Sequence, residues 1–430
     1  MSGDFEQAKS RVCQSEGAYV SVRPLASSWE QRKLGDCFEF LKNNTLSRAD
    51  LNSENGTARN VHYGDILIKF GDCLDGERSD LPFITDDTVL PKFAGSILRE
   101  GDVIFADTAE DEAAGKCVEL RKLPKEPTIS GLHTIPARPR FPFGTGYLGH
   151  YLNSDAYHRQ LLPLMQGIKV ISVSKAALQD TQVRFPSLSE QAAIGAALSE
   201  IDNLITLHQR KYDKLAQLKK SMLDKMFPKP GERFPEIRFA GFTDPWEQRK
   251  LGELLLERNE QAPQSDQYPL MAFIANQGIA PKGDRYDRSA LVNDIEGKLY
   301  KRTEKGDFIY SSNNLETGSI GLNKYGNACI SPVYCIFQPS GIADSDFLGR
   351  RLVRKDFIQE MVKWRQGVIY GQWRIHEADF LRLNIAVPSV DEQRLIGKLL
   401  DNLDALITLH QRKLELLRNT KKSLLDRMFV

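Results

Sequence analysis

Three short motifs in the chain contain residue types that could bind a cofactor or cut DNA. Gly144, Gly146 and Gly149 fit G-x-G-x-x-G, a dinucleotide or S-adenosylmethionine loop, but a proline-rich segment and not a strand precedes them. The segment 331–334 (SPVY) lacks the second proline of an amino-methyltransferase box. Glu296-Gly297-Lys298 after Asp287 has no apolar strand to frame a nuclease site. No Walker loop occurs. The motifs predict no catalytic site, and a nuclease acting alone is the least supported interpretation.

Polar loop residues are better suited to binding nucleic acid than to catalysis. Asparagine and glutamine side chains can pair bidentately with adenine, and arginine with guanine. The same loops would also fit ordinary polar turns, and the sequence leaves that alternative open. The candidate DNA-contacting residues are Lys69, Asp107, Thr108, Lys169 and Lys175 in the first half of the chain and Ser312, Asn313, Asn314, Tyr370, Gln372 and Arg374 in the second.

Composition excludes several classes of protein. The 430 residues carry 58 Lys plus Arg and 57 Asp plus Glu, and 41% are apolar, as in globular proteins with two or three domains. No apolar run reaches 18 residues and no signal-peptide core occurs, so we expect a cytoplasmic protein without a membrane span. The six cysteines never approach CxxC spacing, which predicts reduced thiols and neither zinc nor disulfides.

A long segment occurs twice and dominates the organisation of the chain. Residues 186–227 and 388–429 align without a gap, and about 24 of the 42 positions are identical, including ITLHQRK in both copies. Apolar residues recur with a 3.5-residue period over more than four heptads, which predicts a long helix with a coiled-coil seam in each copy. Between 206 and 231 seven Lys and Arg stand against two Asp, so basic surface is concentrated on this helix.

The heptad positions predict which residues pair the helices. His208 and Lys219 recur at seam positions as His410 and Lys421, where they either reach solvent at the seam edge or fix the register of the pair. The predicted helix-pairing residues are Leu198, Ile201, Ile205, His208, Leu215 and Met222 in the first copy and Leu400, Leu403, Ile407, His410, Leu417 and Leu424 in the second.

A second repeated phrase divides the rest of the chain. WEQRKLG begins at Trp29 and again at Trp246, and Gly101-Asp102 and Gly306-Asp307 each precede an apolar strand. We predict two α+β (α/β) domains with curved, largely antiparallel sheets, separated by two long antiparallel coiled-coil helices. The predicted segments are a tail (1–28), a first recognition domain (29–185), a central helix (186–230), a connector (231–245), a second recognition domain (246–387) and a C-terminal helix (388–430).

This twofold order of motifs resembles the specificity subunit of type I restriction–modification systems. The resemblance implies that each variable domain reads one half of a bipartite, asymmetric double-stranded DNA target. It also implies that the helices dock two methyltransferase subunits, with restriction subunits joining through them. In that family the specificity subunit has no catalytic site, so S-adenosylmethionine, ATP and Mg²⁺ are expected only in partner subunits and no metal in this chain. The alternative is a stand-alone bivalent DNA-binding or architectural protein without enzyme partners.

Overall fold

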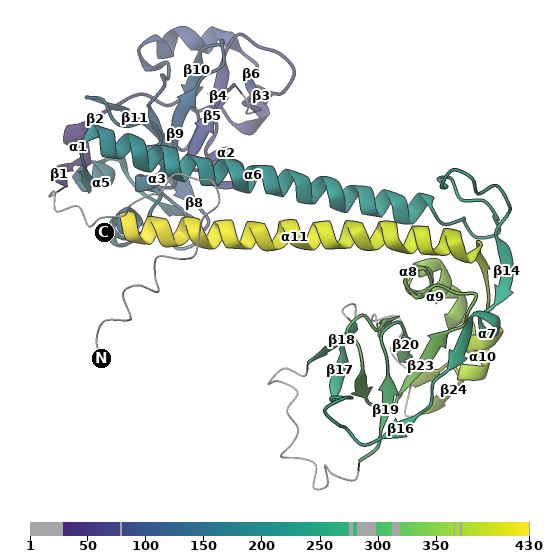
Figure 1. The fold of residues 1–430 in the computed structure, drawn as a ribbon. Coiled ribbons are helices and arrows are strands. Elements are labelled where there is room, and N and C mark those ends of the chain that lie inside the picture. The colour runs from purple at the N-terminus through teal and green to yellow at the C-terminus, as the bar shows by residue number, and fades with distance from the viewer. Residues whose placement is uncertain are drawn as a thin grey trace, which may run out of the picture. The chain divides into compact units, whose positions relative to one another are not determined.

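The computed structural model describes residues 29–77, 80–274, 278–281, 298–311, 319–364, 366–369 and 372–429. The chain forms two compact units (Figure 1). Unit 1 comprises the chain up to Ile205 together with the segment from Leu417 onward, and unit 2 comprises Thr206–Leu416. Each unit therefore contains one domain, the first part of the long helix that follows this domain in the chain, and the last part of the other long helix.

Unit 1 is built on two main sheets. Buried strand β7, whose four residues are all buried, lies at the centre of the larger one. The larger sheet has the order β2 (Phe38–Phe40), β11 (Thr134–Pro139), β7 (Val103–Ala106), β9 (Cys117–Lys122), β5 (Cys73–Asp75). The smaller sheet has the order β10 (Thr128–Ser130), β4 (Arg59–Val61), β6 (Phe83–Ile84), β3 (Leu51–Asn52), and β12 (Ile171–Ser172) pairs with β8 (Thr108–Ala109).

Unit 2 repeats the core of this frame. Its main sheet again has a buried central strand, β20, which follows the Gly306-Asp307 turn. That sheet has the order β15 (Leu255–Glu257), β23 (Tyr334–Pro339), β20 (Phe308–Ser311), β21 (Ile320–Leu322). The remaining pairings are β16 (Gln261–Ala262) with β19 (Tyr300–Thr303) and β22 (Ala328–Ile330), β17 (Met271–Ile274) with β18 (Gly278–Pro281), and β24 (Gln366–Ile369) with β25 (Gln372–Arg374).

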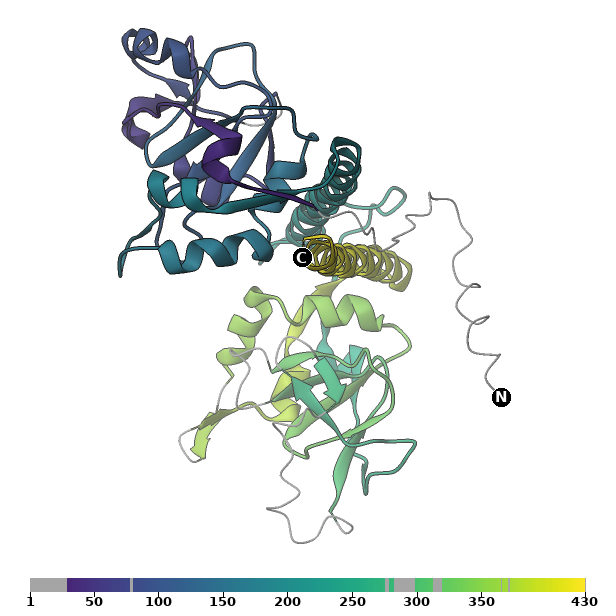
Figure 2. The ribbon, with the colours of Figure 1, turned by 90° about the vertical axis from the view of Figure 1, so that its left-hand side faces the viewer.

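The predicted long helices are α6 (Leu188–Lys225) and α11 (Val390–Met428). Within each unit, stretches of the two lie side by side and antiparallel (Figures 1 and 2), since Lys421 contacts Asp202 in unit 1 and Lys219 contacts Asp404 in unit 2. The shorter helices are α1 (Leu34–Cys37), α2 (Tyr63–Ile68), α3 (Tyr147–Leu152), α4 (Asp155–Leu161), α5 (Lys175–Asp180), α7 (Leu251–Leu254), α8 (Ser345–Arg351), α9 (Lys355–Val362) and α10 (Glu377–Arg382), with 3-10 turns η1 (Arg48–Asp50), η2 (Asp87–Ser96) and η3 (Leu162–Leu164).

The repeated WEQRKLG phrase has the same structural role in both units. In unit 1 it forms β1 (Glu30–Lys33), antiparallel to β13 (Gln182–Phe185), the strand that leads into α6. In unit 2 it forms β14 (Glu247–Lys250), antiparallel to β26 (Asn384–Val387), which leads into α11. The phrase therefore anchors the start of each domain beside the start of a long helix.

Aromatic packing closes each unit at the same place. The Trp29 and Phe429 rings lie 6.1 Å apart in unit 1, and the Trp246 and Phe227 rings also lie 6.1 Å apart in unit 2. Trp246 is fully buried. The end of one helix thus packs on the tryptophan that begins a domain, although only in unit 2 does a connector join the two in sequence.

The predicted fold class is confirmed: each unit combines helices with mostly antiparallel sheets, and two long helices pair as a coiled coil. One detail differs from the prediction. In unit 1, β10 pairs parallel to β4 and β5 pairs parallel to β9. The chain can make these pairs because long segments separate the partner strands, as a parallel crossover requires.

Candidate nucleic-acid interface

Three polar side chains meet where the central strand β7 of unit 1 ends. The Thr108 hydroxyl donates to Asp107 Oδ1 at 2.7 Å, and Nδ1 of His133 lies 3.4 Å from the same carboxylate oxygen. The Asp107 backbone N–H donates to the His133 carbonyl at 3.1 Å. Sequence patterns predicted Asp107 and Thr108 as a candidate pair and gave no signal for His133. The three side chains together offer donors and acceptors for base edges.

His133 adopts an unusual backbone conformation. Its φ of 53° is the one positive value among non-glycine residues in the described part of the chain. Strained residues of this kind cluster at ligand sites. The imidazole remains 47% exposed, and its ring lies 5.3 Å from the ring of Tyr63 at the start of α2. The loop therefore holds a polar ring at the surface beside a second planar ring.

Two cations that pair with Asp65 of α2 bring positive charge to the same neighbourhood. Arg48 donates two hydrogen bonds to the buried carboxylate of Asp65, at 2.8 and 2.9 Å, and Lys69 pairs with that carboxylate at 3.1 Å. Both cations are more than half exposed. Desolvation alone would raise the pKa of Asp65, but the two cations lower it below its usual value. Two cations on one anion leave a net positive charge, which suits a phosphate.

The other predicted contact residues of unit 1 lie on separate elements. Lys169 is exposed in the turn before β12, whose Ser172 pairs in register with Thr108. Lys175 begins α5, and its ammonium lies 5.1 Å from the centroid of the Phe40 ring. The structure therefore places Lys169 in the turn that leads into the strand paired with Thr108, whereas Lys175 packs over an aromatic ring of β2.

The candidate residues of unit 2 fall mostly outside the described residues. Ser312, Asn313, Asn314 and Tyr370 lie outside them; in sequence the first three follow β20, and Tyr370 comes between β24 and β25. The backbones of Gln372 and Arg374 lie in β25. At the position in unit 2 that corresponds to His133, Val333 is 61% exposed. These assignments in unit 2 stay predictions.

The glycine motif of unit 1 has a structural role. Backbone N–H groups of Gly146 and Gly149 donate to the two carboxylate oxygens of Glu119, at 2.5 and 2.8 Å. Burial raises the pKa of Glu119 despite these two donors. A Cβ on Gly149 would meet the Asp72 carbonyl at 2.2 Å. The amides that would cradle a nucleotide phosphate are therefore satisfied by a carboxylate of the protein itself.

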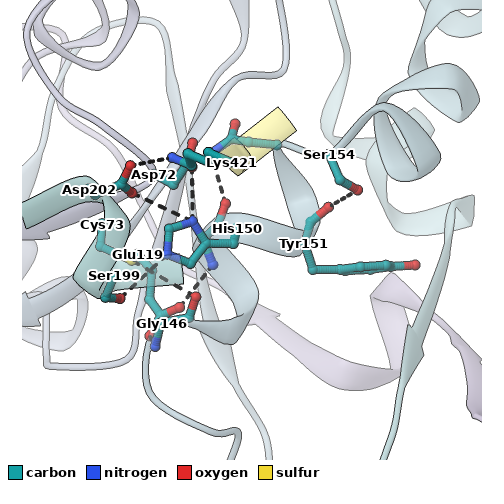
Figure 3. Close-up of polar contacts among 12 residues, drawn as sticks. Asp72, Cys73, Glu119, Gly146, His150, Tyr151, Ser154, Ser199, Asp202 and Lys421 are labelled. Carbon is teal, nitrogen blue, oxygen red and sulfur yellow. Dashed lines mark hydrogen bonds and ion pairs between the residues drawn. The ribbon is translucent and has the colours of Figure 1, made fainter. Parts of the chain in front are cut away.

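A polar cluster joins the domain of unit 1 to both long helices (Figure 3). His150, fully buried on α3, lies with Nδ1 2.9 Å from Asp72 Oδ2. The Lys421 ammonium of α11 donates to Asp72 at 2.7 Å and to Asp202 of α6 at 2.6 Å. Burial alone would raise the pKa of Asp72, but the hydrogen bond from His150 and the charge of Lys421 bring it to about 2. Three helices and the residue that precedes β5 thus meet in this cluster.

Unit 2 has a corresponding cluster of different composition. Lys219 of α6 pairs with Asp404 of α11 at 2.5 Å, and Arg350 of α8 donates to Asp404 at 2.8 Å and to Asp401. Arg350 stands where unit 1 has His150, one residue after the shared Leu-Gly pair. The seam lysines therefore neutralise carboxylates of the facing helix, and at this position unit 2 uses an arginine in place of a histidine.

The predicted helix-pairing residues all lie on the covered side of the helices. None of the twelve is exposed, and Leu198 and Leu400 are completely buried. In unit 2 the Nδ1 atoms of His208 and His410 are 2.8 Å apart, a hydrogen-bond distance. Desolvation, together with nearby positive charge, lowers the pKa of His208 below its usual value. Such a bond needs one of the two rings to be a donor and the other a neutral acceptor.

Comparisons with known proteins find similarity to type I specificity subunits. Residues 243–419 match the family model described as the type I restriction modification DNA specificity domain. The chain is 21% identical over 422 residues to the type I restriction enzyme MjaX specificity subunit of Methanocaldococcus jannaschii, covering 95% of this chain and 94% of that one. The MjaVIII specificity subunit of the same organism is 24% identical over 286 residues, covering 61% and 64%.

A solved structure supports the fold over the same span. The S subunit of a type I restriction–modification system from M. genitalium superposes with a TM-score of 0.58 at 14% identity, covering 95% of this chain and 98% of that one. The resemblance predicted from the repeated motifs is thus confirmed: the chain is similar to type I DNA specificity subunits. Among the described residues, none of the helices is long and apolar enough to span a membrane.

Proposed function

We propose that this chain selects the DNA target of a type I restriction–modification enzyme and has no catalytic site of its own. Each domain reads one half of a bipartite, asymmetric site in double-stranded DNA. The long helices dock two methyltransferase subunits, through which restriction subunits join. S-adenosylmethionine, ATP and Mg²⁺ then belong to those partners. The family match and the occupied glycine loop both support this division of labour.

The observation that carries the proposal is a repeated frame with different residues at equivalent positions. Both main sheets place a buried strand after a Gly-Asp turn, yet unit 1 has His133 where unit 2 has Val333. Because base edges are read by particular side chains, two different sets on one frame favour two different half-sites. A catalytic domain duplicated for chemistry would need the same residues twice.

An exposed apolar stripe on α11 supports docking to protein partners. Four leucines spaced at 11, 3 and 7 residues fall on one helical face, away from the buried seam residues Leu400 and Leu414. They are Leu395, Leu406, Leu409 and Leu416, with exposures of 41, 43, 45 and 66%. A stand-alone DNA-binding protein would leave this stripe in water, which soluble proteins rarely do. The stripe therefore favours helical partners over the stand-alone alternative.

Co-expression with the cognate methyltransferase subunit, followed by native mass measurement, tests the docking proposal. We expect two methyltransferase subunits per chain, and Leu409→Asp with Leu416→Asp should abolish the assembly. Lys422→Asp, an exposed residue of α11 outside the stripe, is the control and should leave the assembly intact. A soluble, partner-free chain that binds its DNA target unaided would favour the stand-alone alternative.

The reading residues of unit 2 are tested by binding. We expect Gln372→Ala or Arg374→Ala to weaken binding to the preferred site by about 1–3 kcal/mol and to relax preference in one half-site only. Lys220→Ala, on the exposed face of α6, should keep the preference and at most reduce the salt dependence. Variants of Gln372 and Arg374 that bind every sequence as the parent does would show that another loop reads the bases.

A further inference from the structure

A short hairpin in unit 1 presents an apolar side chain to solvent. Gln166 and Ser172 exchange backbone hydrogen bonds of 3.0 and 2.8 Å, which closes a turn over the five residues between them. Within that turn Ile168 is 98% exposed and Val170 is 57% exposed. Removing an isoleucine side chain from water stabilises a folded protein. A nearly fully exposed isoleucine on an ordered turn gains none of this.

The geometry of the turn is defined by its own backbone. Gly167 has φ of +116°, and a Cβ there would lie 1.9 Å from the Val170 carbonyl oxygen. Only glycine fits this position without moving the chain. The turn is therefore tightly folded, and Ile168 is held outward by a fixed scaffold.

The hairpin lies at the polar end of the unit 1 sheet. Ser172 pairs with Thr108, and Val173 N–H donates to the Asp107 carbonyl at 2.8 Å. Ile168 lies four positions before Ser172 in the chain, so the Cα atoms of the two residues are at most about 14 Å apart. Lys169, which is exposed, stands beside Ile168 at the tip. The apolar tip thus has a cation next to it, and the strand behind it is paired with the segment that carries the candidate base-contacting residues Asp107 and Thr108.

We infer that Ile168 is an apolar wedge that enters the DNA half-site read by unit 1 and unstacks one base step, with Lys169 on an adjacent phosphate. Isoleucine is among the residues that DNA-bending proteins insert between base pairs. Two apolar side chains offer too little area for a protein partner, since stable interfaces bury about 800 Å² on each side. A wedge between two base pairs needs only one apolar side chain. The inference rests on the proposed function, because it requires that unit 1 contact DNA.

The test uses the complex of the full chain with its methyltransferase subunits. Its DNA is the duplex enriched by that complex from a random library. Unstacked thymines are detected by permanganate, and unstacked adenines by 2-aminopurine placed at each position in turn. We expect one reactive step in the half-site of unit 1 besides any base that a methyltransferase subunit flips for modification. Ile168→Ala should remove that signal and weaken binding about tenfold or more. Ile168→Leu should retain both the unstacking signal and the affinity. Lys169→Ala should weaken binding while keeping the unstacking signal.

Controls separate the possible failures. Ile342→Ala removes another exposed isoleucine, in unit 2, and should change neither the base reactivity nor the affinity for DNA. No unstacked base in the parent complex, or an Ile168→Ala variant with unchanged affinity and reactivity, would overturn the wedge while leaving sequence-selective binding intact. Loss of methyltransferase subunits from the Ile168→Ser complex, measured by mass, would overturn it in favour of a protein contact. If the parent complex enriches no sequence at all, the proposed function itself fails.

Discussion

The side chain of Lys421 is the cation of the polar cluster in unit 1. Its ammonium is 17% exposed and holds two carboxylates, those of Asp72 and Asp202. Removing it leaves the Asp72 carboxylate, which is only 16% exposed, with His150 as its remaining partner beside Asp202. Breaking a buried ion pair by deleting one partner typically costs about 3–5 kcal/mol. We expect Lys421→Met to destabilise unit 1 by about 3 kcal/mol, measured by chemical denaturation of the full chain.

The equivalent change in unit 2 is the matched control. Lys219 is 29% exposed, its partner Asp404 is 35% exposed, and Arg350 remains to neutralise that carboxylate. Lys219→Met should therefore cost about 1 kcal/mol or less. Equal losses from both variants would show that the buried position of the Asp72 cluster is not what makes Lys421 important.

Residue types could be predicted from the sequence better than residue contacts. The recurrence of Lys219 and Lys421 at seam positions was visible, and both a solvent-reaching and a register-fixing role were open. Their partners Asp202 and Asp404 recur as well, but only the antiparallel packing shows that they face these lysines. No sequence pattern predicted a role for His133, because a single loop residue with positive φ belongs to no periodic pattern of apolar and polar residues.

At the scale of elements, glycines set how closely each domain approaches its helix. A Cβ on Gly195 of α6 would meet the Thr145 carbonyl at 2.3 Å, whereas one on Gly397 of α11 would meet the side chain of Asp344 at 2.9 Å. Backbone cannot move away as easily as a side chain. We expect Gly195→Ala to destabilise the folded protein by roughly 2–3 kcal/mol and Gly397→Ala by less than about 1 kcal/mol, measured by thermal unfolding. A larger loss for Gly397→Ala would contradict this account of the packing.

The histidine pair makes the helix pairing sensitive to pH. The pKa of His208 is lower in the folded protein than its ordinary 6.5. Below about pH 6.5 the unfolded chain therefore binds more protons than the folded one, and stability falls as pH falls. Calorimetry at pH 7.5 and 5.5 should show a larger drop in Tm for the parent than for His208→Gln with His410→Gln. The same drop in both proteins would remove the pair as its cause.

The elements themselves were largely predictable. A 3.5-residue period and a gapless repeat define long helices without any tertiary information, and the structure places α6 at Leu188–Lys225 and α11 at Val390–Met428. Strand pairing was harder, because the partners of β5 and β10 are set by contacts far along the chain. Glu392 at the start of α11 illustrates the limit: its carboxylate accepts two hydrogen bonds from Arg238 of the connector, a contact that no local sequence pattern predicts.

At the scale of the whole chain, the repeat predicts a permuted protein. Phe429 packs against Trp29 in unit 1 as Phe227 packs against Trp246 in unit 2. Joining the C-terminus to residue 29 by a short linker and opening the chain at the exposed Gly241 should therefore preserve both units. We expect the permutant to assemble with methyltransferase and to enrich the same DNA sequence. An insoluble permutant with a soluble parent would contradict the twofold arrangement.

The central claim is that two different domains on one frame give this chain a bipartite DNA specificity. Methylome sequencing of a host carrying the chain together with its methyltransferase tests it most directly. The account predicts methylation at one asymmetric sequence made of two half-sites with a fixed, unspecific spacer. Asp107→Ala with Thr108→Ala should alter only one half. Methylation at a single uninterrupted site, or an identical methylome without this chain, would contradict it.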